Sequence, residues 1–349
     1  MARHRKWFSL LTRWLWGGNV EAPEYGWVRW FFLRALGLLF LAAFLSLWPQ
    51  MLDVAGGEGK QPVAKTISTA QAQFNAGNIG ADRYRQLPTL CWFNTSDAFL
   101  RLQCAAGTAL AGLLVIGIAP APCLVLLWLI YLSLTTACGN PYSFRWEDLL
   151  LETGFLAVFL APLQLRPSHP LNEPRPSRIA LWLLRWLLFR LMIGSDILRL
   201  PADAGIPHWI STGLGFGFSY LLPLFIFLPR RPRHLAGLAF VVAQLVRLPA
   251  SEHPLANAIT IALCLTLLDD AAITRWLPGK LKRASALGKT PQRRWPIIAE
   301  LAVTGLVICA SYTQSFQLVG IYMPGPEPIV QLNGWLRPFH TFNPYRQSP

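Results

Sequence analysis

The chain has 349 residues, of which 53% are hydrophobic and 14% are charged, and its formal net charge is +14. Soluble domains carry roughly 25% charged residues, so this composition excludes an ordinary soluble protein and predicts a membrane protein. The basic residues lie in short clusters between apolar runs rather than along one face or in one tail. This pattern argues against nucleic-acid binding and indicates an orientation in a membrane.

Residues 1–28 are predicted to form a cytoplasmic or interfacial segment. The apolar stretch WFSLLTRWLW, residues 7–16, is short, is broken by Arg13 and is followed by no small-residue cleavage site. We therefore expect no cleavable signal peptide. The stretch either lies flat in the membrane interface with its tryptophans at headgroup depth, or is disordered.

Residues 29–314 are predicted to form an all-α, polytopic bundle of about nine transmembrane helices, within a range of about seven to ten. The predicted spans are apolar runs of bilayer length separated by loop-forming residues, at 29–50, 98–119, 121–138, 147–165, 178–198, 209–229, 233–248, 255–271 and 296–314.

The distribution of Lys and Arg predicts a cytoplasmic N-terminus. With this orientation the cytoplasmic side receives the N-terminal basic residues, the pair Arg166 and Arg175, the cluster around Arg230 and the basic loop 272–295. The loop 52–97 and the C-terminal tail 315–349 are then external or lumenal, on the side that is poor in Lys and Arg, as the positive-inside rule expects. The Gly- and Ala-rich part of the external loop, 52–86, is predicted to be flexible.

Three ionisable residues, Glu152, Arg185 and Arg190, fall inside predicted spans, where a central charge costs about 2.5 to 3.5 kcal/mol. In a hairpin of the fourth and fifth spans, Glu152 and Arg190 lie about 8 and about 12 Å below the external surface, which predicts a buried ion pair. Arg185 lies nearer the cytoplasmic face, where it can snorkel. All three are interpreted either as polar contacts that hold helices together or as a substrate or proton site. Asp196 and Arg199 are three residues apart and are predicted to pair locally.

Polar residues at helix ends are predicted to have structural roles. Asp269 and Asp270 end the span 255–271 at the cytoplasmic side, beside Arg275. Asn94 or Ser96 precedes the second span and is placed to cap its unbonded N–H groups.

The sequence predicts no metal site and no cofactor, and it favours a protein without enzymatic activity. The six histidines are scattered without metal-ligand spacing, and none of the common phosphate-binding, metalloprotease or nucleophile motifs occurs. Cys91 and Cys138 both lie at the predicted external end of the membrane. They are either two unpaired thiols or a disulfide formed in an oxidising compartment.

Five segments combine apolar helices with polar residues at fixed places. They are LPTLCWFNTSDAFLRLQCAAG (87–107), GIAPAPCLVLLWLIYLSL (117–134), FRWEDLLLETGFLAVFLAPLQL (144–165), PSRIALWLLRWLLFRLMIGSDILRL (176–200) and NAITIALCLTLLDDA (257–271). The motif residues in them are Trp92, Phe93, Asn94, Asp97, Trp146, Asp148, Asp269 and Asp270. Together and in this order, the segments resemble the lipase maturation factor family.

The resemblance implies a multi-pass, chaperone-like protein that assists lipases or related secreted clients to reach an active, assembled state. Its partners are then the lipid bilayer and a client protein. It implies the endoplasmic reticulum membrane, or the cytoplasmic membrane if the source is bacterial. The alternative from a different class is a membrane enzyme or small-solute transporter that uses a polar cavity around Glu152 and Arg190.

Two departures from the family pattern are expected to matter. Family members follow the RWLLFRLM helix with a segment rich in Trp, His, Tyr and Gln, whereas here GSDILRL runs directly into PADAGIPHW. The family's soluble C-terminal domain would begin near PFHTFNPYRQSP, where this sequence stops. We therefore expect a diverged or shortened member.

Overall fold

The computed structural model describes residues 23–77, 83–138, 145–166, 175–193, 213, 215–251, 254–275, 295–318 and 327–339. Within these ranges every regular element is a helix, as predicted. The chain divides into two compact units. The first unit comprises residues 1–32, 169–290 and 346–349, and the second unit comprises residues 33–168 and 291–345.

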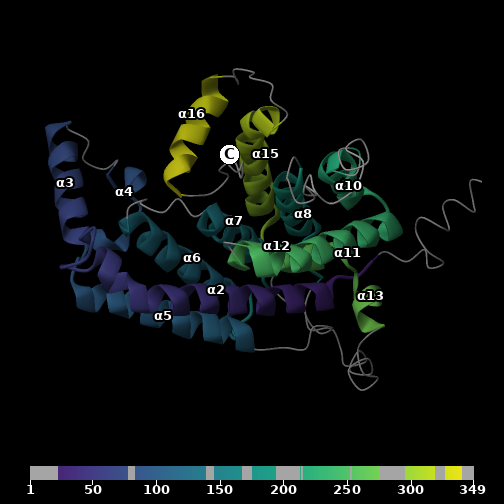
Figure 1. The fold of residues 1–349 in the computed structure, drawn as a ribbon, viewed down its shortest axis with the longest axis horizontal. Coiled ribbons are helices and arrows are strands. Elements are labelled where there is room, and N and C mark those ends of the chain that lie inside the picture. Colours follow the sequence, from purple (N-terminus) through teal and green to yellow (C-terminus); the bar gives the residue numbers. More distant parts are fainter. Residues whose placement is uncertain are drawn as a thin grey trace, which may run out of the picture. The chain divides into compact units, whose positions relative to one another are not determined.

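The second unit is built from long apolar helices. The helix α5 (Asp97–Ile116) packs against α6 (Pro120–Ala137), which also packs against α7 (Arg145–Leu160) (Figure 1). The helix α2 (Gly26–Ala55) begins in the first unit and enters the second at Leu33. In the described ranges, α2, α5 and α6 are the three helices that are long and apolar enough to cross a membrane. They support an integral membrane protein, while nine spans and the orientation stay predictions.

Local signals fix both ends of α5. The Ser96 hydroxyl accepts a hydrogen bond from the Phe99 N–H at 3.3 Å, and the Asn94 side-chain oxygen accepts one from the Ser96 N–H at 2.8 Å. Ser96 is therefore the N-cap residue, as predicted. At the other end Gly117 has φ of 95°, a left-handed conformation that favours glycine, and its N–H bonds to the Leu113 carbonyl at 2.9 Å.

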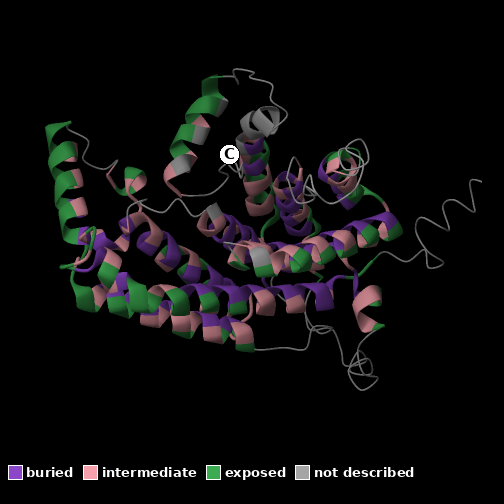
Figure 2. Ribbon diagram, viewed as in Figure 1, coloured by how far each residue is buried: buried purple, intermediate pink, exposed green. Residues whose placement is uncertain are grey.

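Aromatic rings fill the core of the second unit where α2 and α6 meet. Phe40 and Phe44 of α2 pack edge-on against Tyr131 of α6, with ring centroids 6.1 and 5.5 Å apart. All three side chains are buried in helices that Figure 2 shows with many buried residues. Gly107 of α5 faces Phe44 so closely that an added Cβ would overlap the ring. The helices thus approach at a position that only glycine leaves open.

The first unit contains α8 (Arg178–Met192), α11 (Arg230–Arg247) and α12 (Pro254–Cys264), with α11 and α12 packed side by side (Figure 1). An interrupted helix precedes α11, and 3₁₀ turns and a short helix follow the longer helices. The smaller elements are η2 (Gly217–Leu221), α10 (Leu222–Leu224), η3 (Phe225–Phe227), η4 (Leu248–Ala250), η5 (Leu265–Leu267) and α13 (Asp270–Thr274). Residues 217–227, which belong to the predicted span 209–229, form successive π, α and 3₁₀ turns, and Pro223, which lacks an N–H group, interrupts regular α-helical bonding there.

Each predicted span overlaps a described helix, but two other predictions were wrong in detail. The span 255–271 does not end in a continuous helix, because η5 interrupts it and Asp269 starts α13. The loop 52–86 is not uniformly flexible, because it contains the helix α3 (Val63–Ala76), whose Val63 and Ile67 are buried. The remaining helices are α4 (Arg83–Gln86), η1 (Leu90–Trp92), α15 (Ile297–Leu318), α16 (Glu327–Leu336) and η7 (Arg337–Phe339). The stretch 7–16 lies outside the described residues.

Candidate functional site: arginines around the LTLLDD segment

Residues Leu265–Asp270, called the LTLLDD segment, join α12 to α13 in the first unit. Asp269 has the extended backbone of an N-cap residue, so α13 starts directly after it. The last carbonyl groups of one helix and the first N–H groups of the next have no partners within their own helices. The segment therefore presents backbone acceptors and donors that side chains from other elements can bind.

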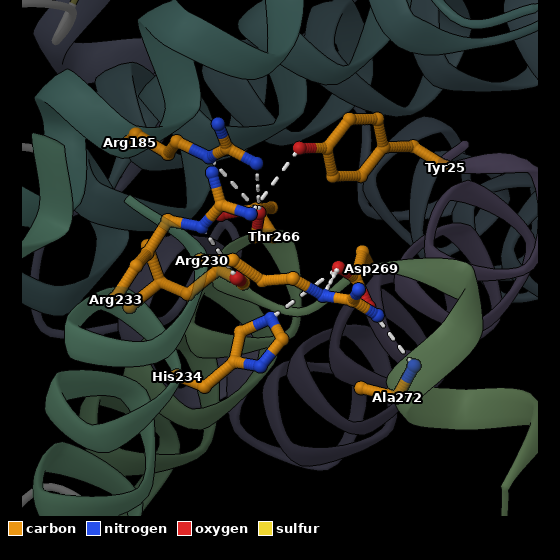
Figure 3. A network of polar contacts seen from close by, with 9 residues as sticks. Tyr25, Arg185, Arg230, Arg233, His234, Thr266, Asp269 and Ala272 are labelled. Carbon is orange, nitrogen blue, oxygen red and sulfur yellow. Dashed lines mark hydrogen bonds and ion pairs between the residues drawn. The ribbon is translucent and has the colours of Figure 1, made fainter. Parts of the chain in front are cut away.

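Two arginines bind the carbonyl groups of this segment (Figure 3). Arg185 of α8 donates to the Thr266 carbonyl oxygen from Nε at 3.0 Å and from Nη2 at 2.7 Å. Arg233 of α11 donates from Nε to the Leu267 carbonyl oxygen at 2.9 Å and from Nη2 to the Tyr25 hydroxyl at 3.3 Å. A guanidinium charge is favourable at the negative end of a helix. These bonds tie α8, α11 and the chain before α2 to one helix end.

Asp269 receives its partners from α11 and from its own helix. Arg230 binds both carboxylate oxygens, with Nε 2.5 Å from Oδ2 and Nη2 3.1 Å from Oδ1. The Ala272 N–H donates to Oδ1 at 2.9 Å, which caps α13, and His234 Nε2 lies 3.7 Å from Oδ2. The Asp269 side chain is almost fully buried. A bidentate arginine contact is the strong form of ion pair for such a carboxylate.

Asp270 is directed to a different helix. Its carboxylate accepts hydrogen bonds from the Gly26 N–H at 2.7 Å and the Val28 N–H at 3.1 Å, so it caps the first turn of α2. Its own N–H donates to the Glu24 carbonyl oxygen at 3.0 Å. Burial raises the pKa of the Asp270 carboxyl above its ordinary value, and the bonds from the α2 backbone oppose this rise.

We call Arg185, Arg230, Arg233, His234 and Asp269 the arginine cluster. It contains three arginines and one carboxylate, which binds Arg230, because Asp270 bonds to the start of α2 instead. Arg185 also lies over the Tyr25 ring, with its guanidinium carbon 5.1 Å from the ring centroid. The cluster therefore holds α8, α11, α13 and the start of α2 together and keeps a positive surplus.

A second polar network lies in the second unit. It anchors residues 87–94, called the LPTLCWFN segment, to α5 and α6. The Ser133 hydroxyl of α6 donates to the Gln103 side-chain oxygen of α5 at 2.8 Å and accepts from the Leu90 N–H at 2.8 Å. The Thr89 hydroxyl lies 3.1 Å from the Ser133 hydroxyl and 3.0 Å from the Ser133 carbonyl oxygen. Thr89, Gln103 and Ser133 are buried, so their mutual bonds replace those to solvent.

The motif residues after this network have different environments. Trp92 donates from Nε1 to the Leu87 carbonyl oxygen at 2.9 Å, and its ring lies 6.2 Å from those of Phe74 and Tyr84. Phe93 is 78% exposed. The Asp97 carboxylate accepts a 2.9 Å hydrogen bond from the Gly57 N–H. The motif thus combines an anchored tryptophan with an exposed phenylalanine.

The other predicted site residues are placed as follows. Glu152 is buried on α7 in the second unit, and Arg190 is buried on α8 in the first unit. Their pairing stays a prediction.

The remaining predicted residues lie elsewhere. Asp148 lies in the first turn of α7, and the centroid of the Trp146 ring lies 6.5 Å from that of Tyr131. Asp196 and Arg199 lie outside the described residues. For Arg185, the contacts with Thr266 fit the interpretation as a polar contact that holds helices together.

Cys91 and Cys138 are free thiols in the structure. The Gln103 side-chain nitrogen lies 3.8 Å from the Cys91 sulfur, and the Cys138 sulfur lies 3.8 Å from that of Met51. The structure therefore contains no disulfide between Cys91 and Cys138.

The sequence interpretation missed the partners of the LTLLDD segment. It treated the basic run at Arg230–His234 as an orientation signal and placed the two aspartates beside Arg275 at a helix end. In the structure Asp269 pairs with Arg230 and starts a new helix. The depth argument used for Glu152 would have found this pair. In an antiparallel hairpin of α11 and α12, the start of α11 lies level with the end of α12.

Comparison with known proteins identifies the family. A family model described as the lipase maturation factor transmembrane domain matches residues 27–214, which is more than half of the chain. No solved structure matches.

Individual relatives agree with this match. Lipase maturation factor 1 of Mus musculus is 31% identical over 274 residues, which cover 69% of this chain and 47% of the mouse protein. Lipase maturation factor 2 of Gallus gallus is 30% identical over 298 residues, which cover 74% of this chain and 41% of the chicken protein. The chain spans about half the length of the curated relatives that it matches. The chain belongs to the lipase maturation factor family.

Proposed function

We propose that this protein is a membrane-embedded assembly factor that helps a secreted lipase to reach its active, assembled state. The observation that carries the proposal is the family match over residues 27–214, which includes α2, α5, α6, α7 and α8. Relatives named lipase maturation factor 1 and 2 support the same role. The identity of the client and the way in which it is engaged are part of the proposal.

We also propose a location and an orientation. The protein is a multi-pass component of the endoplasmic reticulum membrane, or of the bacterial cytoplasmic membrane, with a cytoplasmic N-terminus and an external loop 52–97. The Lys and Arg asymmetry of the sequence supports this orientation. The external loop then presents the exposed Phe93 ring in the compartment where a secreted lipase folds.

Site-specific photo-crosslinking tests both proposals together. A photoreactive residue replaces Phe93 on the predicted external side or, as the matched control, Arg166 on the predicted cytoplasmic side; both positions are exposed. The tagged full chain is expressed with a secreted lipase from the same organism. We expect the lipase to crosslink at position 93 and not at position 166. Crosslinking at 166 alone would overturn the orientation, and none at either position would count against a client at this loop.

A further inference from the structure

The first turn of α11 carries several arginines at the N-terminal end of the helix, where positive charge is unfavourable. It contains Arg230, Arg231 and Arg233, it contains no acidic residue, and no side chain caps it. The N-terminus of a helix carries a partial positive charge, so arginines in this turn are electrostatically unfavourable unless an anion compensates them. Negative charge near this turn would therefore stabilise it.

The described protein supplies only part of that negative charge. Asp269 is bound by Arg230, and Arg233 bonds to the Leu267 carbonyl group and the Tyr25 hydroxyl. Asp270 caps α2 instead. Arg231 is exposed and makes no hydrogen bond or ion pair with the described residues. The Arg230 side chain keeps 28% of its surface exposed. An outside anion can therefore reach both arginines.

Arg231 heads an apolar stripe along the same helix. Leu235, Leu238, Val242 and Leu245 follow it at intervals of four, three, four and three residues, which places all five on one helical face. The four apolar side chains are between 50% and 62% exposed. The opposite face is buried, and α11 accordingly alternates between purple and lighter residues in Figure 2.

We propose that this face of α11 binds an anionic phospholipid. The headgroup phosphate lies at Arg231, within the field of Arg230, and an acyl chain runs along Leu235, Leu238, Val242 and Leu245. Charge complementarity selects the headgroup, because a zwitterionic lipid such as phosphatidylcholine brings its own cation. The apolar stripe selects a lipid over a free anion, because inorganic phosphate gains nothing from it. Basic residues at the cytoplasmic membrane surface are suited to anionic lipids.

The test titrates the purified full chain in detergent with dioleoylphosphatidylglycerol or dioleoylphosphatidylcholine and follows the thermal unfolding midpoint. We expect phosphatidylglycerol to raise the midpoint more than phosphatidylcholine does. Arg231→Gln should weaken the apparent affinity for phosphatidylglycerol about fivefold, since one surface arginine contributes on the order of that factor. Arg166→Gln removes an exposed arginine predicted on the same membrane side and should leave the affinity unchanged.

A second variant and a second probe separate the lipid from its phosphate. Leu238→Gln changes an exposed side chain of the stripe and should weaken phosphatidylglycerol binding without lowering the midpoint of the lipid-free protein. Inorganic phosphate at the same concentration should give no shift. Equal responses of Arg231→Gln and the unmodified chain, equal losses in Arg166→Gln and Arg231→Gln, or a full effect of phosphate alone would each overturn the proposal.

Discussion

Asp269 and Asp270 are neighbours in the chain, yet their carboxylates cap two different helices. Asp269 caps α13 through the Ala272 N–H and binds Arg230, whereas Asp270 caps α2 through the Gly26 and Val28 N–H groups. The Asp270 bonds thus join positions that lie more than 240 residues apart in sequence, whereas Asp269 and Arg230 are 39 residues apart. Loss of the Asp269 carboxylate should therefore affect α13 and Arg230, and loss of the Asp270 carboxylate should affect the start of α2.

Asp269→Asn should destabilise the protein because it leaves the arginine cluster without its carboxylate. Loss of hydrogen bonds between charged groups costs about 1.5 to 3 kcal/mol. Thermal unfolding in detergent measures the effect. The control Arg231→Gln, which changes an exposed residue next to Arg230 in α11, should change stability by less than about 0.5 kcal/mol. The double variant Asp269→Asn with Arg230→Gln should lose less than the sum of the single losses. Strict additivity would mean that the pair contributes nothing to stability.

Asp270→Asn should reveal a dependence on pH. Because the folded state raises the pKa of Asp270, its contribution to stability is complete below the ordinary aspartate pKa and is lost as pH rises through the raised value. Asparagine also caps helices well and does not titrate, so it serves as the reference. The stability of the unmodified chain relative to Asp270→Asn, measured between about pH 4 and 7, should fall with rising pH. A relative stability that grows with pH would contradict this assignment.

Gly107→Ala should destabilise the second unit, since the new methyl group would overlap the buried Phe44 ring. Overpacking of this kind costs about 1 to 3 kcal/mol. Gly112 lies on the same helix, and an added Cβ would meet no atom within 4 Å, so Gly112→Ala is the matched control and should be neutral or stabilising by up to about 1 kcal/mol. Thermal unfolding of both variants in one detergent decides the matter. Equal midpoints would show that α2 and α5 do not approach at Gly107.

Ser133→Ala should loosen the LPTLCWFN segment, because it leaves the Leu90 N–H and the Gln103 side-chain oxygen without this partner. A buried polar group deprived of its bond costs about 1 to 3 kcal/mol. Thr135→Ala is the control, because the Thr135 hydroxyl donates to carbonyl groups of its own helix. Hydrogen exchange of the Leu90 and Cys91 amides should accelerate in Ser133→Ala only. Unchanged exchange would show that the network does not hold the segment.

The lengths of the apolar runs predicted where most helices lie, whereas the polar residues predicted the helix ends less well. The span 98–119 coincides closely with α5 because a serine cap and a glycine end are both local signals. The span 255–271 ended wrongly because its break at η5 is satisfied by Arg185 and Arg233 from distant elements. The Gly- and Ala-rich composition of residues 52–86 predicted a flexible loop, yet Val63 and Ile67 of α3 are buried. Contacts between distant segments are not encoded in the local pattern that a single sequence displays.

The most direct test of the central claim measures lipase maturation itself. A secreted lipase from the same organism is expressed with or without this chain in cells that lack their own lipase maturation factor, and secreted lipase activity is divided by secreted lipase mass. We predict a higher specific activity with the chain present, and a loss of that gain in Gly107→Ala but not in Gly112→Ala. An unchanged specific activity, with the chain present in the membrane at normal levels, would contradict a role in lipase maturation.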